Sequence, residues 1–142
     1  MNTQLAFFAR LLMASLFLIS AYNKIMGFKV VAGVMAAKGF PAPEAMLVLT
    51  ILLETIGALL LIANWHAALA AVALAVFTFV SGTIFHDFWQ AKPEVAFSEM
   101  NHFLKNIAIV GGLLLVAALP RPARDGETQP SPVRRFFVRL II

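Results

Sequence analysis

Apolar residues fill four stretches of the chain, and each stretch is long enough to cross a lipid bilayer as a helix. The stretches run from about Gln4 to Met26, Pro43 to Ala63, Ala67 to Trp89 and Glu99 to Leu119. Each holds roughly 20 residues, which cover a hydrocarbon core of about 30 Å at about 1.5 Å per residue. Lipid admits only helices and closed barrels, and barrel strands are shorter than these stretches. The pattern therefore predicts an all-α bundle of four transmembrane helices.

The connections between these stretches are short. Asn64–His66 predicts a tight helical hairpin, and the loop Gln90–Ser98 ends in a serine suited to cap the fourth helix. The stretch Lys29–Lys38 is mainly apolar between two lysines, which is typical of a short helix on the membrane surface. We expect no cleaved signal peptide, because no basic residue precedes the first apolar run and Arg10 interrupts it.

We expect residues 1–120 to form the membrane domain and residues 121–142 to form a basic tail. The tail is polar and rich in proline, which favours disorder, and its end from Arg134 to Ile142 could press on the membrane surface. The chain has a net charge of +4, but five of its eleven Lys and Arg residues lie in this tail. Basic residues beside a span favour contact with anionic membrane lipids rather than with nucleic acid.

Composition supports a membrane protein, since 61% of the residues are hydrophobic and only 13% are charged. Soluble domains have about 45–50% apolar and about 25% charged residues. The absence of Cys excludes disulfides, thiol catalysis and thiolate metal sites.

Three charged residues, Arg10, Glu54 and Lys105, interrupt three of the apolar stretches. A charge at the centre of a membrane helix costs about 2.5–3.5 kcal/mol on insertion scales, so such residues tend to pair inside the bundle. Counting residues from the helix ends places Arg10 and Lys105 on either side of Glu54 in depth. We therefore predict a structural ion pair between an ionised Glu54 and Arg10 or Lys105. The alternative is that Arg10 and Lys105 snorkel to the interfaces, with Glu54 a structural counter-ion only.

Helical periodicity predicts one inward face on each span, where small residues would allow close packing. In chain order these faces are Arg10, Ala14, Phe17, Ala21 and Lys24; Thr50, Glu54, Gly57, Ala58 and Leu61; Phe79, Gly82, His86 and Trp89; and His102, Lys105, Asn106, Ile109 and Leu113.

The histidines fall near the end of the bundle opposite the termini, where they predict a polar funnel. We expect His86 and Lys105 to be the catalytic groups, and Glu54, Trp89, His102 and Asn106 to bind a ligand. Phe85, Phe88, Trp89 and Phe103 would form the rim of the funnel. The alternative is that the histidines only meet water at the interface and the aromatic residues form a lipid-facing belt. No spacing on one helix is typical of a metal site, so we predict none.

Several motifs of this chain, in this order, resemble those of the DoxX family of small four-helix membrane proteins. They are Arg10-Leu11-Leu12 with Phe17-Leu18-Ile19-Ser20-Ala21-Tyr22-Asn23-Lys24, then Gly39-Phe40-Pro41, Glu54-Thr55-Ile56-Gly57-Ala58-Leu59-Leu60-Leu61, Phe85-His86-Asp87-Phe88-Trp89, His102-Phe103-Leu104-Lys105-Asn106-Ile107-Ala108 and Gly111-Gly112-Leu113-Leu114-Leu115. The resemblance covers about residues 5–120. It departs from the family at Ala58, where members often have a second glycine.

The resemblance implies a multi-pass protein of the inner (plasma) membrane. The family is named after a subunit of an archaeal thiosulfate:quinone oxidoreductase, which implies quinone-linked redox chemistry, with a quinone as the cofactor and electrons from a partner oxidoreductase subunit or from a bound cofactor. In that case Lys105 or Asn106 would bind a quinone carbonyl, and His86 or His102 would handle protons. Two alternatives stay open: a non-catalytic scaffold for another membrane protein, and a small-solute or proton carrier, which would need a homo-oligomer.

Basic residues also predict the orientation of the bundle. Four spans place both termini on one side, together with five tail arginines, whereas the other side has Lys24, Lys29, Lys38 and Lys92 outside the spans. The excess of five over four favours cytoplasmic termini by the positive-inside rule. The funnel would then open on the extracytoplasmic side.

Overall fold

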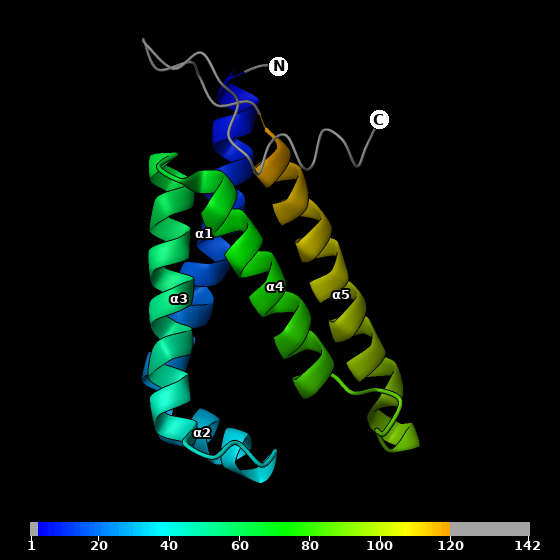
Figure 1. The fold of residues 1–142 in the computed structure, drawn as a ribbon. Coiled ribbons are helices and arrows are strands. Elements are labelled where there is room, and N and C mark those ends of the chain that lie inside the picture. The colour runs from blue at the N-terminus through cyan, green and yellow to red at the C-terminus, as the bar shows by residue number, and fades with distance from the viewer. Residues whose placement is uncertain (1–2, 120–142) are drawn as a thin grey trace.

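The computed structural model describes residues 3–119, and this part of the chain forms five helices (Figure 1). They are α1 (Thr3–Met26), α2 (Phe28–Ala37), α3 (Pro43–Ala63), α4 (Ala67–Phe85) and α5 (Pro93–Ala118). α1, α3, α4 and α5 are each long and apolar enough to cross a membrane. The prediction of an all-α bundle with four spans is confirmed. The predicted tail, residues 121–142, lies outside the described residues.

Two predicted helix boundaries are wrong, and both lie in the connection between α4 and α5. α4 ends at Phe85 rather than at Trp89, because the backbone of His86 leaves the helical region (φ −124°, ψ 51°). Tight turns follow, in which the backbone N–H of Gln90 donates to the carbonyl of Asp87. α5 begins at Pro93 rather than at Glu99. Proline suits the first helical position because it lacks the N–H that a helix start leaves unpaired. Ser98 therefore lies inside α5 and is not its cap.

The helices form two pairs that meet at one end of the bundle. α1 packs along α3, and α4 packs along α5. The turn Asn64–His66 joins α3 to α4 as the predicted hairpin, with Asn64 and His66 both in the left-handed region. Figure 1 shows this turn at the same end as the start of α1 and the end of α5, called here the terminal end. α3 and α4 diverge toward the other end, called here the α2 end.

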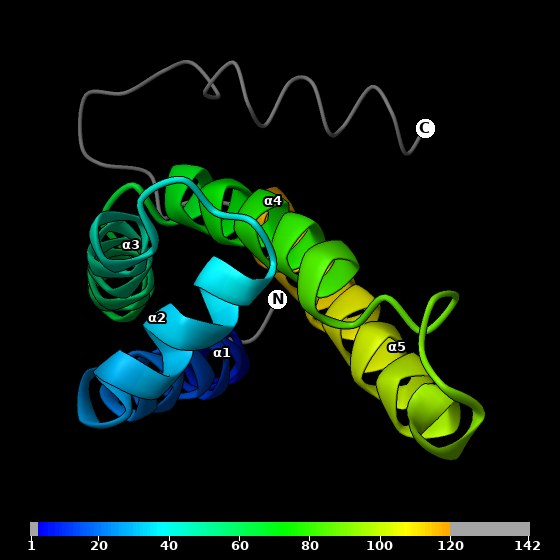
Figure 2. The same ribbon diagram turned by 90° about the horizontal axis from the view of Figure 1, so that it is seen from below.

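α2 closes part of that other end. The short helix predicted over Lys29–Lys38 forms as α2, shifted by one residue, and it lies across the bundle axis near the end of α1 and beside α3 (Figures 1 and 2). Ala32 and Met35 of α2 form a small buried cluster with Leu47 of α3. Phe40, in the loop after α2, and Phe85 pack against this cluster.

The larger hydrophobic core lies toward the terminal end and depends on small residues of α4. Ala71 and Leu74 are fully buried, and Gly57 of α3 approaches Leu74 closely. The predicted inward faces of α1 and α3 are confirmed at Ala14, Phe17, Ala21, Glu54, Gly57, Ala58 and Leu61, which are all buried.

The inward faces predicted for α4 and α5 are only partly right. Gly82 is buried as predicted, whereas Phe79 is 48% exposed and α4 turns Leu74 and Thr78 inward instead. α4 is apolar on all sides, so its periodicity gives no unique inward face. On α5, Leu113 is buried as predicted, whereas Lys105 is exposed.

Candidate functional site

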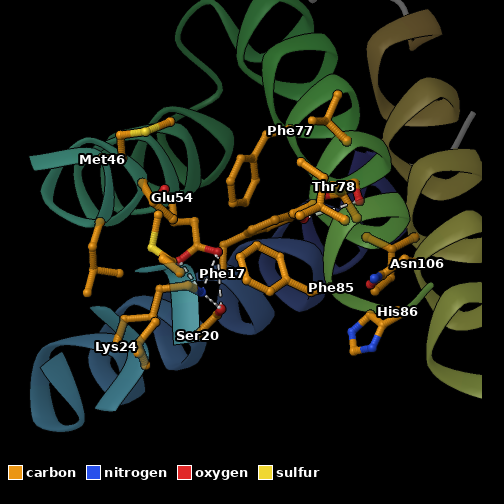
Figure 3. A pocket seen from close by; sticks show the side chains of 18 of the residues that line it. Phe17, Ser20, Lys24, Met46, Glu54, Phe77, Thr78, Phe85, His86 and Asn106 are labelled. Atoms are coloured by element: carbon orange, nitrogen blue, oxygen red, sulfur yellow. Dashed lines mark hydrogen bonds and ion pairs between the residues drawn. The ribbon is translucent and has the colours of Figure 1, made fainter. Parts of the chain in front are cut away.

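A cavity of about 440 Å³ lies between the two helix pairs, on the side of the bundle closed by α2. Its walls are mostly apolar and come from all five helices. The lining residues include Phe17, Ser20 and Lys24 of α1, Met35 of α2, Glu54 of α3, Phe77, Thr78, Ile84 and Phe85 of α4, His86, and Asn106 and Ile109 of α5. Figure 3 shows Ser20, Lys24 and Glu54 on one side of the cavity and Thr78, His86 and Asn106 on the other, with aromatic rings between them.

The first wall carries a charged triad formed by Lys24, Ser20 and Glu54. The Nζ of Lys24 donates to Oε1 and Oε2 of Glu54 at 2.9 and 3.0 Å, and to Oγ of Ser20 at 2.5 Å. The hydroxyl of Ser20 donates to Oε1 of Glu54 at 3.1 Å. An ammonium has three protons to donate, so Lys24 uses all of them within the triad. The side chain of Glu54 is only 3% exposed, and Lys24 supplies the opposite charge that its burial requires.

The predicted ion pair of Glu54 is therefore wrong in its partner. Lys105 is exposed on α5 and does not line the cavity. No salt bridge among residues 3–119 includes Arg10. Within the same residues, Nε of Arg10 is buried and has no hydrogen-bond partner. The prediction counted Lys24 as a charge outside the spans, at the end of the first helix. In the structure, Ser20 and Lys24 of α1 both reach Glu54 in the middle of α3.

The second wall carries uncharged polar groups from α4 and α5. Thr78 is 5% exposed, and its hydroxyl finds no hydrogen-bond partner among the described residues. Asn106 packs over Gly82, one helical turn after Thr78, where an added Cβ would lie 3.0 Å from Nδ2 of Asn106. The glycine thus makes room for the amide. Asn106 lines the cavity and adds a carboxamide to an otherwise apolar wall, whereas the hydroxyl oxygen of Thr78 is buried away from the cavity space.

His86 sits where this wall meets the loop after α4. Its Nδ1 lies 2.8 Å from Oε2 of Glu99, and its ring stacks on that of His102 with centroids 5.0 Å apart. His86 lines the cavity, whereas His102 is exposed and does not. The stacked pair of histidine rings therefore extends from the cavity, at His86, to the exposed surface of the protein, at His102.

The predicted funnel is thus only partly assembled. The cavity is lined by the predicted residues Glu54, His86 and Asn106, but not by Trp89, His102 or Lys105. Trp89 is 53% exposed and packs against Phe88 and Phe103. Of the four residues expected at the rim, only Phe85 lines the cavity.

Two contacts join the loop after α2 to the end of α4 beside the cavity. The rings of Phe40 and Phe85 stack with centroids 5.9 Å apart. The Nζ of Lys38 donates to Oδ1 of Asp87 at 2.9 Å. This hydrogen bond is the main cause of a lowered pKa of the Asp87 carboxyl.

Sequence reasoning missed Ser20, Lys24 and Thr78 as site residues. Ser20 and Lys24 stand four positions apart, the spacing that brings two side chains together on one helical face. That spacing, on the stripe already containing Phe17 and Ala21, was the available signal. Thr78 offered a weaker one, as a single hydroxyl within a largely apolar stretch.

Comparisons with known proteins agree with the membrane architecture. The family model DoxX matches residues 5–87. Inner membrane protein YphA of Escherichia coli K12 is 28% identical over 109 residues, which cover 77% of this chain and 78% of that protein. Inner membrane protein YqjF of the same organism is 37% identical over 109 residues, with the same coverage of both chains. No solved structure matches.

Proposed function

Because this chain belongs to the DoxX family, we propose that it is an inner-membrane protein that binds a small apolar ligand of the quinone class. The match agrees with the family resemblance drawn from the motifs. Both relatives are named as inner membrane proteins, and four helices of this chain can span a membrane. The observation that carries the ligand proposal is the cavity of about 440 Å³ with hydrogen-bonding groups on two opposite walls.

A quinone head group fits the chemistry of this cavity. Ligand sites of about 300–1,000 Å³ are typically apolar with a few polar groups that fix the orientation of the ligand. The rings of Phe17, Phe77 and Phe85 suit a flat apolar ring. The two carbonyls of a quinone point in opposite directions, and polar residues lie on both sides of the cavity, the charged triad on one and His86 and Asn106 on the other. The amide of Asn106 can donate to one carbonyl while the other lies toward the triad.

A quinone held in this cavity would supply two-electron, two-proton redox chemistry. Since this chain has no Cys that could cycle between thiol and disulfide, the electrons would come from a partner oxidoreductase subunit or from a bound cofactor. His86 and Glu99 lie between the cavity and the loop surface, so they are the groups best placed to pass protons from water. We propose that this loop faces the extracytoplasmic side.

Binding is tested on the full-length protein purified in mild detergent. Lipids extracted from it are searched for quinone, and a short-chain ubiquinone analogue is titrated while the melting temperature is recorded. A ligand that binds only the folded state raises that temperature by mass action. Wild-type protein with neither a co-purifying quinone nor a shift would overturn the quinone proposal and favour the scaffold.

A matched pair of variants on α5 shows whether the cavity is the binding site. Ile109→Trp fills the cavity, because Ile109 lines it, and should abolish the shift. Leu115→Trp adds the same ring at a position that is 67% exposed and outside the cavity, so it should leave the shift intact. Equal shifts in both variants would place the quinone elsewhere on the protein.

A further inference from the structure

We infer that Thr50 is the specificity-determining hydrogen-bond donor for one ligand oxygen on the α3 wall of the cavity, an inference that rests on the proposed quinone binding. Thr50 stands four residues before Glu54 on α3, and both residues line the cavity. Side chains four positions apart lie on one helical face, so Thr50 belongs to the wall that carries the charged triad. Met46 and Leu47, one turn before Thr50, line the cavity as well. Thr50 therefore lies within a continuous stripe of α3 that faces the cavity.

The charged triad offers no free donor on this wall. All three ammonium protons of Lys24 are used within the triad, and the Ser20 hydroxyl donates to Glu54. A ligand carbonyl that accepted a hydrogen bond from the triad would first have to break one. An uncommitted donor on this side of the cavity therefore has to come from another residue.

Four residues with a hydroxyl line the cavity, and three of these hydroxyls are committed or out of reach. Ser20 belongs to the triad, Ser81 donates to the carbonyl of Thr78 at 3.3 Å, and the hydroxyl oxygen of Thr78 is fully buried. Thr50 is half-buried, and the side-chain hydrogen bonds among residues 3–119 do not include it. Its oxygen is also accessible, since it is not among the unpartnered atoms that this part of the chain buries completely. A ligand can thus gain a hydrogen bond from Thr50 without breaking another.

Asn106 offers a second uncommitted donor on the opposite wall. It lies on α5, across the cavity from Glu54 (Figure 3), and the side-chain hydrogen bonds of the described residues leave its amide free as well. Gly82 of α4 makes room for this amide, because an added Cβ there would lie 3.0 Å from Nδ2. α3 and α5 belong to different helix pairs, so the two donors stand on either side of the cavity.

Two donors on opposite walls select a ring with an oxygen at each end. A hydroxyl and a carboxamide each contain a donor and an acceptor. They can donate to the two carbonyls of a quinone, and they can accept from the two hydroxyls of a quinol after the Thr50 hydroxyl rotates. The pair therefore favours rings with two opposite oxygens over hydrocarbon rings of the same shape, in either oxidation state.

The test measures dissociation constants of purified full-length protein for two probes, a short-chain ubiquinone analogue and an alkylbenzene with the same tail. Thr50→Val keeps the shape of the side chain and removes only the hydroxyl. It should raise the dissociation constant for the quinone about fivefold and leave that for the alkylbenzene unchanged. Thr50→Ser keeps the hydroxyl and should bind the quinone as wild type does. The matched control is Thr55→Val, at a half-buried position of the same helix outside the cavity, where both constants should stay as in wild type.

A double variant tests whether the two donors hold different oxygens. Asn106→Leu alone should weaken quinone binding by a factor similar to that of Thr50→Val. Because independent contacts contribute additively to the binding free energy, the two variants combined should weaken it about 25-fold. A double variant that binds the quinone as tightly as either single variant would overturn the arrangement of two donors.

The two probes also separate this inference from the proposed function. Quinone binding by Thr50→Val as tight as that of wild type, or an equal loss for both probes, would overturn the inference while leaving quinone binding intact. Wild-type protein that binds neither probe would instead overturn the proposed function, and this inference with it.

Discussion

Lys24 and Glu54 keep two opposite charges inside the span region because each satisfies the other. The carboxylate is nearly inaccessible, whereas the side chain of Lys24 keeps 22% exposure toward the α2 end. Ser20 supplies one more hydrogen bond to the carboxylate. A buried pair of this kind adds little net stability over an apolar pair, but breaking it leaves an uncompensated charge.

Glu54→Gln should therefore destabilise the protein by about 3 kcal/mol, at the low end for a broken buried pair because Lys24 is partly exposed. The measurement is the unfolding free energy in mild detergent. The double variant Lys24→Met with Glu54→Leu should recover most of the loss, since it removes both charges. Lys105→Met is the control, and its stability should stay near wild type because Lys105 is exposed. A loss in Lys105→Met as large as that in Glu54→Gln would restore the pairing predicted from sequence.

The sequence predicted where the helices begin and end better than it predicted which face of each helix is buried. The bounds of α3 follow from Pro43 at its start and from the turn Asn64–His66, which are both local signals. The inward face of α4 depends on which neighbours cover an evenly apolar helix, so Thr78 was missed and Phe79 was placed inward. The end of α4 was also missed, because His86 to Trp89 continue the apolar pattern while the backbone already turns.

Close packing of α3 against α4 depends on Gly57. A Cβ at this position would lie 2.9 Å from Cγ and Cδ1 of Leu74, which is fully buried and has no room to move away. Gly57→Ala should therefore destabilise the bundle by about 1–3 kcal/mol, the usual cost of overpacking. Gly111→Ala on α5 meets nothing within 4 Å and should be neutral or stabilise by up to about 1 kcal/mol. The comparison uses unfolding in detergent, and equal effects of the two variants would contradict the close contact.

The contact between the α2–α3 loop and the α4–α5 loop should depend on pH. Because Lys38 lowers the pKa of Asp87, the ion pair contributes its stability above the ordinary Asp pKa of 3.8 and loses it as the pH falls through the lower, folded-state value. Melting temperatures of wild type and Asp87→Asn should therefore differ at pH 6 and converge in strong acid. An Asp87→Asn variant that differs from wild type equally at both pH values would contradict this pairing.

At the scale of the whole molecule, the four-span architecture was predictable because each span can be recognised in the sequence by its length and hydropathy. The cavity was not predictable, since it arises from the divergence of the two helix pairs and from α2, which closes part of the opening. Counting residues along single helices cannot reveal either feature. This is why Glu54, His86 and Asn106 were found as site residues, while the opposite charge on Lys24 was not.

The structure also sharpens the prediction of orientation. Lys24 now counts as an intramembrane charge, so the α2 end keeps three basic residues outside the spans, Lys29, Lys38 and Lys92, against five arginines in residues 121–142. The positive-inside rule thus favours cytoplasmic termini more clearly.

Because the chain has no Cys, Trp65→Cys and Gln90→Cys each introduce a single thiol, in the turn at the terminal end and in the α4–α5 loop. A membrane-impermeant maleimide should label Gln90→Cys in intact spheroplasts, and Trp65→Cys only after permeabilisation. Leu52→Cys, on the outer face of α3, is the control and should resist labelling in both conditions. Labelling of both loop thiols from outside would contradict the four spans, and the reverse pattern would place the cavity opening at the cytoplasmic face.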